Sequence, residues 1–259
     1  MRLGIFKNIQ PLSPTVHHSI PTNAKDEWHL QKFANAAYST LDTIQNTYDM
    51  TKHVINNNIP GVLVECGVAA GAQIAVMHQC CLDNNKRIPI YAFDSYEGIP
   101  LASKDDDEQP GIGSDFHRVE YADTRELLKS SGITVHSLEN VTKTINTWFP
   151  STNTDFNYVK GWFQDTLSSV DYPISILRLD GDLYESTKVC LEVLYPLLSV
   201  GGILIIDDWN LAGCRRAFSE YFQNMNNLVE LDVPSGVQNI LSNNNININS
   251  FESPFNYVL

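Results

Sequence analysis

The sequence predicts an α/β protein whose sheet is mostly parallel and carries helices on both faces. Short apolar runs rich in β-branched residues alternate along the chain with longer segments of helical periodicity. The runs are almost continuously apolar, as expected for parallel strands that are covered on both sides. The segments between them are long enough to bring the chain back to the start of the next parallel strand.

The elements follow from this alternation in chain order. Residues 1–25, rich in Pro, Thr, His and Asn, are expected to form an irregular arm, and residues 26–58 are expected to be helical. The expected strands are 61–65, 89–94, 156–160, 174–180 and 202–207. The expected helices beyond residue 58 are 71–83, 120–130, 138–147, 184–198 and 211–224.

Two long loops interrupt the alternation. The first spans 98–118 and contains the acidic run Asp105-Asp106-Asp107-Glu108, which is expected to be solvated. A loop this long at the carboxyl end of a strand is also typical of a lid over a binding site. The second is the tail from residue 233, whose Asn-rich run from Ser242 to Asn249 has the low complexity of a loop.

Composition narrows the classes of partner. The chain has 259 residues, of which 43% are hydrophobic, and carries a net charge of −13. A domain this acidic is a poor partner for nucleic acid or an anionic membrane, so a small molecule is expected. The five cysteines are odd in number and form no Cys-x-x-Cys pair, which favours reduced thiols in the cytoplasm. Cys66, Cys80 and Cys190 are expected in the core, and neither a signal peptide nor a membrane span is predicted.

Three aspartates stand where two expected strands end. Asp180 closes the run 174–179, and Asp207 and Asp208 close the run 202–206. If the two strands are neighbours, the three carboxylates share one crevice, where open α/β sheets bind ligands. Like charges this close need a neutralising partner, and a hard divalent cation bound by oxygen is one such partner. Arg178, two residues before Asp180, is the alternative source of that positive charge.

A second group of residues suits a nucleotide-like cofactor. The first strand ends in Glu65-Cys66-Gly67-Val68-Ala69-Ala70-Gly71, whose small residues let the backbone approach a ligand closely. Asp94-Ser95 ends the second strand, where an acid can accept hydrogen bonds from ribose hydroxyls. After the third strand, Trp162 and Phe163 are candidates to pack on an adenine ring, with Asp165 beside them. This order of features fits an S-adenosylmethionine-dependent methyltransferase of class I.

At these residues the chain resembles the macrocin O-methyltransferase (TylF-type) family. The resemblance covers roughly residues 59–220 and rests on IPGVLVECGVAAG, YAFDSYEGIP, VKGWFQDTL, LRLDGDLYEST and LYPLLSVGGILIIDDW followed by CRRA. It departs from the family pattern at Ala69-Ala70, where a bulky and a basic residue are usual, in the N-terminal arm, and in the tail after residue 225.

The resemblance implies a Rossmann-like class I methyltransferase fold, S-adenosylmethionine as donor and a magnesium ion. It implies an N-terminal arm and helical cap over residues 1–58 and a catalytic domain over 59–259, together one structural domain. A hydroxyl of a sugar or glycosylated small molecule is the expected acceptor, and a homodimer is expected. The implied cofactor-binding residues are Glu65, Gly67, Gly71, Asp94, Ser95, Trp162, Phe163, Asp165 and Asp180. The implied metal ligands are Asp180, Asp207 and Asp208.

The mechanism expected from these residues is metal-assisted transfer of a methyl group to oxygen. Asp180 is the first candidate for the general base, and Asp182 and His117 are the others. One alternative is a non-catalytic S-adenosylmethionine-binding scaffold. The other is an NAD-linked sugar-nucleotide oxidoreductase, whose Tyr-x-x-x-Lys pair is matched by Tyr48 to Lys52, which lies before the first strand and not where that class needs it.

Overall fold

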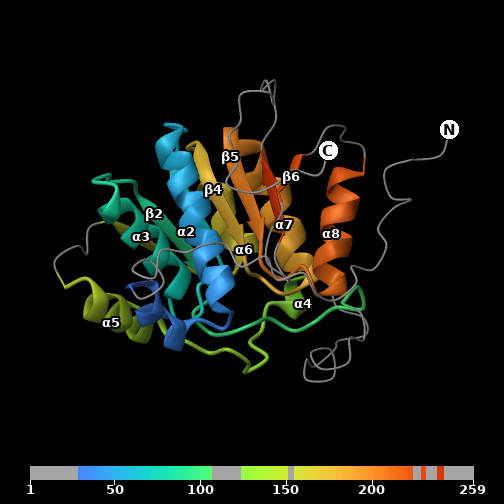
Figure 1. Cartoon of the computed structure of the whole chain (residues 1–259). Helices are drawn as coiled ribbons and strands as arrows, with labels where there is room; N and C mark the ends of the chain where they lie inside the picture. Colours follow the sequence, from blue (N-terminus) through green and yellow to red (C-terminus); the bar gives the residue numbers. More distant parts are fainter. Residues whose placement is uncertain (1–28, 107–123, 151–154, 224–228, 232–237, 242–259) are drawn as a thin grey trace, which may run out of the picture.

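The computed structural model describes residues 29–106, 124–150, 155–223, 229–231 and 238–241, and these residues contain one seven-stranded sheet (Figure 1). The strand order is β3-β2-β1-β4-β5-β7-β6, in which the first five strands are parallel. The strands are β1 (Val62–Cys66), β2 (Ile90–Asp94), β3 (Phe156–Lys160), β4 (Ile174–Leu179), β5 (Leu198–Ile206), β6 (Val229–Leu231) and β7 (Gln238–Leu241). The predicted α/β class with a mostly parallel sheet is confirmed.

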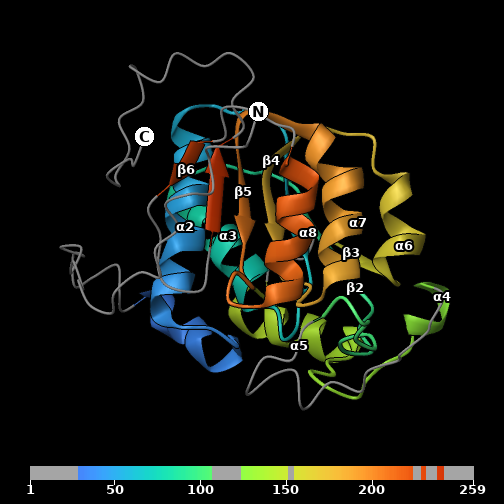
Figure 2. The ribbon, with the colours of Figure 1, turned by 90° about the vertical axis from the view of Figure 1, so that its right-hand side faces the viewer.

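Helices cover both faces of this sheet (Figure 2). One face packs against α2 (Leu41–Asn56), α3 (Ala72–Asp83) and α5 (Leu138–Trp148), and the other against α7 (Tyr184–Leu194) and α8 (Ala212–Phe222). The shorter helices are η1 (Gln31–Ala36), α4 (Thr124–Leu127), α6 (Phe163–Thr166), η2 (Leu167–Ser169) and η3 (Tyr195–Leu197). The order of helices and strands brings the carboxyl ends of β1 to β5 to one edge, at the bottom of Figure 1.

The strands are buried on both sides because successive residues enter different cores. In β4, Ile176 belongs to the core beneath α2 and α3, whereas Leu177 belongs to the core beneath α7 and α8. Ile205 and Leu204 divide in the same way in β5. Side chains alternate across a strand, so an uninterrupted apolar run supplies both cores at once. All five cysteines are buried and free, which confirms Cys66, Cys80 and Cys190 as core residues.

The expected continuous helix over 26–58 is wrong in its described part. The chain is extended between η1 and α2, where Ala37 has φ −92° and ψ 133°. Thr40 then caps α2, because its side chain accepts a hydrogen bond from the backbone N–H of Thr43 at 3.3 Å. The sequence has helical periodicity on both sides of the break, so the short extended segment between the two helices was not predicted.

The expected elements near the carboxyl end also need correction. The helix expected over 184–198 ends at Leu194, and η3, which contains Pro196, leads into a β5 that begins at Leu198. The tail from 233, expected to be a loop, contributes β7, which pairs antiparallel with β5. The helix expected over 120–130 is reduced in its described part to α4. The arm 1–25 and the run Ser242 to Asn249 lie outside the described residues.

Within the described residues, every helix is too short or too polar to cross a lipid bilayer.

Candidate active site

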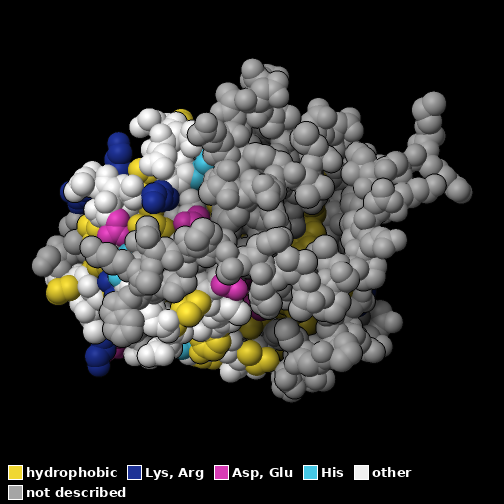
Figure 3. All heavy atoms as spheres, in the orientation of Figure 1, with side chains coloured by type: hydrophobic (Ala, Val, Ile, Leu, Met, Phe, Trp, Pro, Cys, Tyr) yellow, Lys and Arg dark blue, Asp and Glu magenta, His cyan; other side chains and the backbone are white. Residues whose placement is uncertain are grey.

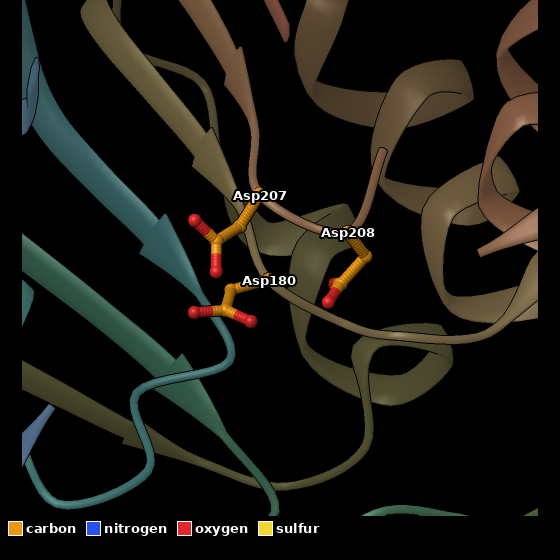
Figure 4. A group of neighbouring side chains, drawn as sticks. All are labelled: Asp180, Asp207 and Asp208. Carbon is orange, nitrogen blue, oxygen red and sulfur yellow. The ribbon is translucent and has the colours of Figure 1, made fainter. Parts of the chain in front are cut away.

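Three carboxylates meet at the carboxyl ends of β4 and β5, as the sequence predicts. Asp180 follows β4, Asp207 and Asp208 follow β5, and their side chains point into one space (Figure 4). One oxygen of each carboxylate lies within 4.8 Å of the others. The parallel register pairs Leu179 with Ile206, so the residues that follow these two leave the sheet side by side.

A single buried arginine lies behind this group. The Arg178 side chain is 0% exposed, and its Nη1 lies 2.6 Å from Glu65 Oε1 and 2.7 Å from Asp180 Oδ2. Its Nη2 lies 2.7 Å from Asp207 Oδ1. Arg178 is paired in register with Glu65 on β1, so both side chains lie on the face that packs against α2 and α3. Arg178 therefore supplies positive charge to these carboxylates, as the sequence allowed.

One guanidinium does not balance the acids around it. Asp182 lies at φ +58°, which lets its N–H donate to Asp208 Oδ2 at 2.8 Å. Burial raises the pKa of Asp207 to about 7, although Arg178 opposes the shift. Burial, reinforced by neighbouring carboxylates, holds the pKa of Asp182 and of Asp208 well above the usual aspartate range. The acids crowd one another to the point that ionising all of them is unfavourable.

This donor set fits a hard divalent cation. Asp180, Asp207 and Asp208 offer carboxylate oxygens close enough together to share one ion. The guanidinium of Arg178 pairs with three carboxyl groups, those of Glu65, Asp180 and Asp207, and Asp182 and Asp208 add two more acids beside them. Two further positive charges would leave this group far closer to neutral. The geometry and the charge both favour a metal site there.

The turn between β1 and α3 passes directly against the end of β4. Gly67 has φ +88°, and a Cβ atom at this position would lie 1.7 Å from the carbonyl oxygen of Asp180. The Asp180 N–H donates to the carbonyl of Cys66 at 2.8 Å. Gly71, at φ +93°, begins α3 as its N-cap residue. Only glycine allows the loop and the strand end to approach so closely.

Asp94 holds this turn in place. Its Oδ2 accepts the N–H of Val68 at 2.7 Å and of Ala69 at 3.3 Å, and its Oδ1 accepts the N–H of Tyr96 at 2.6 Å. Burial raises its pKa, and these hydrogen bonds oppose the shift. Asp94 therefore shapes the loop itself, in addition to facing the cavity described next.

The strand ends, the turn and residues 36–39 line an open cavity of about 1000 Å³, a volume that includes the solvent at its mouth. Hydrophobic side chains gather near this edge of the molecule on the face of Figure 3. Of the predicted site residues, the cavity is lined by Glu65, Gly67, Asp94, Ser95, Trp162, Phe163, Asp180, Asp207 and Asp208. Asp182, the second candidate base, lines it as well. The predicted donor residues and the predicted metal ligands thus face one space.

Two predicted site residues are not brought to the cavity wall. Asp165 lies at the surface, where its carboxylate pairs with Arg125, and Gln164 lines the cavity in its place. Gly71 is absent from the lining because Val141 and Ile145 of α5 pack against it. The third candidate base, His117, lies outside the described residues.

Several lining residues were not foreseen from the sequence. Ala36 at the end of η1 and the segment 37–39 that follows it form one wall, and Gln73 of α3 forms part of the same cavity. Tyr38 bridges this segment to the loop before α5, with its hydroxyl 2.7 Å from His136 Nε2. Because residues 26–58 were expected to be helical, there was no reason in the sequence to expect that this segment leaves the helix and reaches the cavity.

Asp106 was expected to be solvated and is buried. Its carboxylate accepts the N–H of Ser103 at 2.8 Å and the N–H of Tyr184 at 2.7 Å. The second bond caps α7, whose own N-cap residue, Leu183, offers no side-chain acceptor. Asp106 thus fixes the start of the helix that follows Asp180 and Asp182. Asp107 and Glu108 lie outside the described residues.

Curated proteins can be aligned with most of this chain. The demethyldecarbamoylnovobiocin O-methyltransferase of Streptomyces niveus is 32% identical over 186 residues, which are 70% of this chain and 65% of that protein. A Streptomyces olivaceus protein named 8-demethyl-8-(2,3-dimethoxy-alpha-L-rhamnosyl)-tetracenomycin-C 4'-O-methyltransferase is also 32% identical, over 70% of this chain and 65% of its own length. The alignments thus span slightly under two thirds of these relatives.

The fold and the family agree with these alignments. The solved structure of the O-methyltransferase NovP superposes with a TM-score of 0.64 and 28% identity, covering 80% of this chain and 81% of that one. Residues 22–234 match the model of one protein family, Macrocin-O-methyltransferase (TylF). Since that match spans well over half of the sequence, the chain belongs to the macrocin-O-methyltransferase (TylF) family.

Proposed function

We propose that this protein is an S-adenosylmethionine-dependent, magnesium-dependent O-methyltransferase that acts on a hydroxyl of a sugar or glycosylated small molecule. The observation that carries the proposal is the shared cavity, into which the glycine turn after β1 and the three acids after β4 and β5 both open. Family membership supports the reaction class. The rhamnosyl group in the name of the Streptomyces olivaceus relative supports a sugar acceptor.

The donor is assigned to the β1 and β2 side of the cavity. Gly67 keeps the turn low enough for a cofactor to lie against the end of β4. Asp94 and Ser95 at the end of β2 suit the ribose, and Trp162 and Phe163 at the far wall suit the adenine. Asp165 has no direct part in this assignment, because its side chain pairs with Arg125 at the surface.

Asp180, Asp207 and Asp208 would hold the magnesium ion. When bound, the ion supplies Lewis-acid chemistry that lowers the pKa of an acceptor hydroxyl. Arg178 fixes two of these carboxylates from behind and leaves their remaining oxygens for the cavity side. Asp208 is oriented by the N–H of Asp182.

Asp182 is the stronger of the two described candidates for the general base. Asp180 already accepts a hydrogen bond from Arg178 and belongs to the metal group, whereas the Asp182 carboxylate makes no hydrogen bond to any described residue. Asp182 takes the acceptor's hydroxyl proton while the oxygen attacks the sulfonium methyl carbon. The carbon–sulfur bond breaks, and S-adenosylhomocysteine leaves.

Calorimetric titration with S-adenosylhomocysteine, with magnesium and with EDTA, tests the donor assignment. Binding in both conditions is expected, because the donor residues and the metal acids are separate groups in the cavity. Absence of binding in both conditions would overturn the proposal. Magnesium-dependent formation of S-adenosylhomocysteine with rhamnosylated acceptors then separates an enzyme from a scaffold that only binds the donor.

The oxidoreductase alternative gains no support from the site. Tyr48 lies in α2, and its hydroxyl donates to Asp83 at 2.8 Å. Neither Tyr48 nor Lys52 lines the cavity.

A further inference from the structure

Within the described residues, the side-chain amide of Gln73 has a hydrogen-bond partner for its nitrogen but none for its oxygen. It lies in the first turn of α3, lines the cavity and is 6% exposed. Its Nε2 donates to Ser39 Oγ at 3.0 Å, across the gap between α3 and the segment before α2. Its Oε1 is buried and has no hydrogen-bond partner among the described residues. A buried amide oxygen without a partner is rare, and such an atom calls for a donor supplied from the cavity.

Hydrogen-bond donors lie on the same wall, close to the Gln73 acceptor. Gly71, the N-cap residue of α3, provides no side-chain acceptor, and the first turn of the helix contains no acidic residue. The N–H groups at the start of a helix have no partner within the helix and attract negative charge. Ala72 and Gln73, the first two residues of α3, both line the cavity. An unpaired acceptor and unpaired donors therefore lie within one helical turn of each other.

A ligand that carries an ammonium and a carboxylate on one carbon matches this arrangement. Glu65, on the adjoining strand β1, adds a second acceptor, since its Oε2 is also buried without a hydrogen-bond partner. Two acceptors on this wall favour an ammonium group, which carries three N–H donors and can donate to both of them. The α-amino acid end of S-adenosylmethionine has this chemistry.

We propose that Gln73, held in position by Ser39, binds the α-ammonium group of the methyl donor, a role that rests on the proposed donor. Ser39 fixes one end of the amide, so that the oxygen is committed to the ligand. Ser39 lies in the break between η1 and α2, and this break brings its hydroxyl to the Gln73 amide. The N-terminal segment is thus a working part of the donor site.

The test compares two ligands that differ only in the relevant end. S-Adenosylhomocysteine has the α-amino acid group, and 5′-methylthioadenosine lacks it. In Gln73→Leu, which keeps the size of the side chain, S-adenosylhomocysteine is expected to bind roughly 10- to 100-fold more weakly, whereas 5′-methylthioadenosine binds as in the wild type. Ser39→Ala, at a partly exposed position, is expected to show a smaller loss with the same ligand selectivity.

Gln79→Leu is the matched control. It makes the same chemical change on the same helix, at a residue that bonds to Lys32 and Asp83 at the surface. Both ligands are expected to bind this variant normally. Equal weakening of the two ligands by Gln73→Leu, or no weakening of either, would overturn the role of Gln73. Failure of the wild-type protein to bind either ligand would instead remove the proposed donor, and this role with it.

Discussion

Arg178 and Glu65 lie opposite each other on neighbouring parallel strands, and their side chains meet at 2.6 Å where neither reaches solvent. Even with this partner, burial raises the pKa of Glu65 to about 8. Desolvation of the two groups therefore offsets much of the attraction between them. Arg178 gains further attraction because it also pairs with Asp180 and Asp207.

Replacing Arg178 by Met is expected to destabilise the fold by about 3–5 kcal/mol, because it leaves buried carboxylates without their partner. The double variant Arg178→Met with Glu65→Gln is expected to lose less than the sum of the single losses. Urea unfolding at neutral pH measures both. Arg125→Met, which breaks the exposed pair with Asp165, is the control and should cost about 0–1 kcal/mol. Similar losses in the two arginine variants would contradict the importance of the buried pair.

Asp180→Asn and Asp182→Asn are expected to fail in different ways. Asp180→Asn removes one of the proposed metal ligands, so Mn²⁺ affinity measured by calorimetry should fall and turnover should be lost. Asp182→Asn should retain Mn²⁺ binding and lower kcat by roughly 10²- to 10⁴-fold. Both variants should still bind S-adenosylhomocysteine. Full activity in the Asp180 variant would refute the metal assignment, and an active Asp182 variant would return the role of base to another group.

Gly67→Ala should be far more damaging than Gly132→Ala. Both glycines have positive φ, at +88° and +82°, so each alanine carries a similar backbone cost of about 1 kcal/mol. Only at Gly67 does the new methyl group collide with the Asp180 carbonyl, whereas at Gly132 no described atom lies within 4 Å. The Gly67 variant should therefore lose more stability in urea and also lose S-adenosylhomocysteine affinity. Equal behaviour of the two variants would mean that the turn and β4 separate without cost.

Removing the cap of α7 should loosen the start of that helix. Asp106→Ala is expected to cost about 1–2 kcal/mol in the free energy of unfolding, because the Tyr184 N–H loses its acceptor. Asp105→Ala removes only a pair with Arg216 near the surface and should cost less than about 1 kcal/mol. Thermal unfolding of both variants gives the comparison. An Asp106 variant as stable as the wild type would show that the bond contributes nothing.

Acidification should destabilise the fold through His78. Its ring packs between Phe149 and Phe156 at centroid distances of 4.7 and 4.9 Å, and burial lowers its pKa. The unfolded chain, with an ordinary histidine pKa near about 6.5, then binds more protons than the folded one below that pH, so stability falls as the pH falls. His78→Gln should lose less Tm between about pH 7.5 and 5.5 than the wild type does. His136→Gln, at the surface pair with Tyr38, is the matched substitution that controls for the loss of an imidazole as such.

The sequence predicts the strand ends well because their signals are local. An apolar run that stops at Asp180 or at Asp207 identifies both a buried strand and the polar edge of the sheet. The acids then meet once β4 and β5 are neighbours, which is the order that the structure shows. The glycine turn was equally visible, since Gly67 and Gly71 interrupt an otherwise apolar stretch.

The remaining features depend on contacts between distant segments. The short break before α2 is stabilised by the Thr40 cap and by the bond from Ser39 to Gln73. The acidic run gave no sign that Asp106 would turn inward to α7. β7 forms because the exposed edge of β5 is available for pairing, which the polar tail does not reveal. Each of these depends on a partner more than 30 residues away or on the geometry of a single cap.

The contact between the Gly67 turn and the Asp180 carbonyl has a consequence for engineering. Backbone meets backbone there, with no side chain between them to be trimmed or enlarged. If the proposed reaction is correct, the spacing between donor methyl and acceptor oxygen is a fixed dimension of the sheet. Libraries aimed at new acceptors should therefore vary the peripheral wall around Thr134 and leave the strand ends untouched.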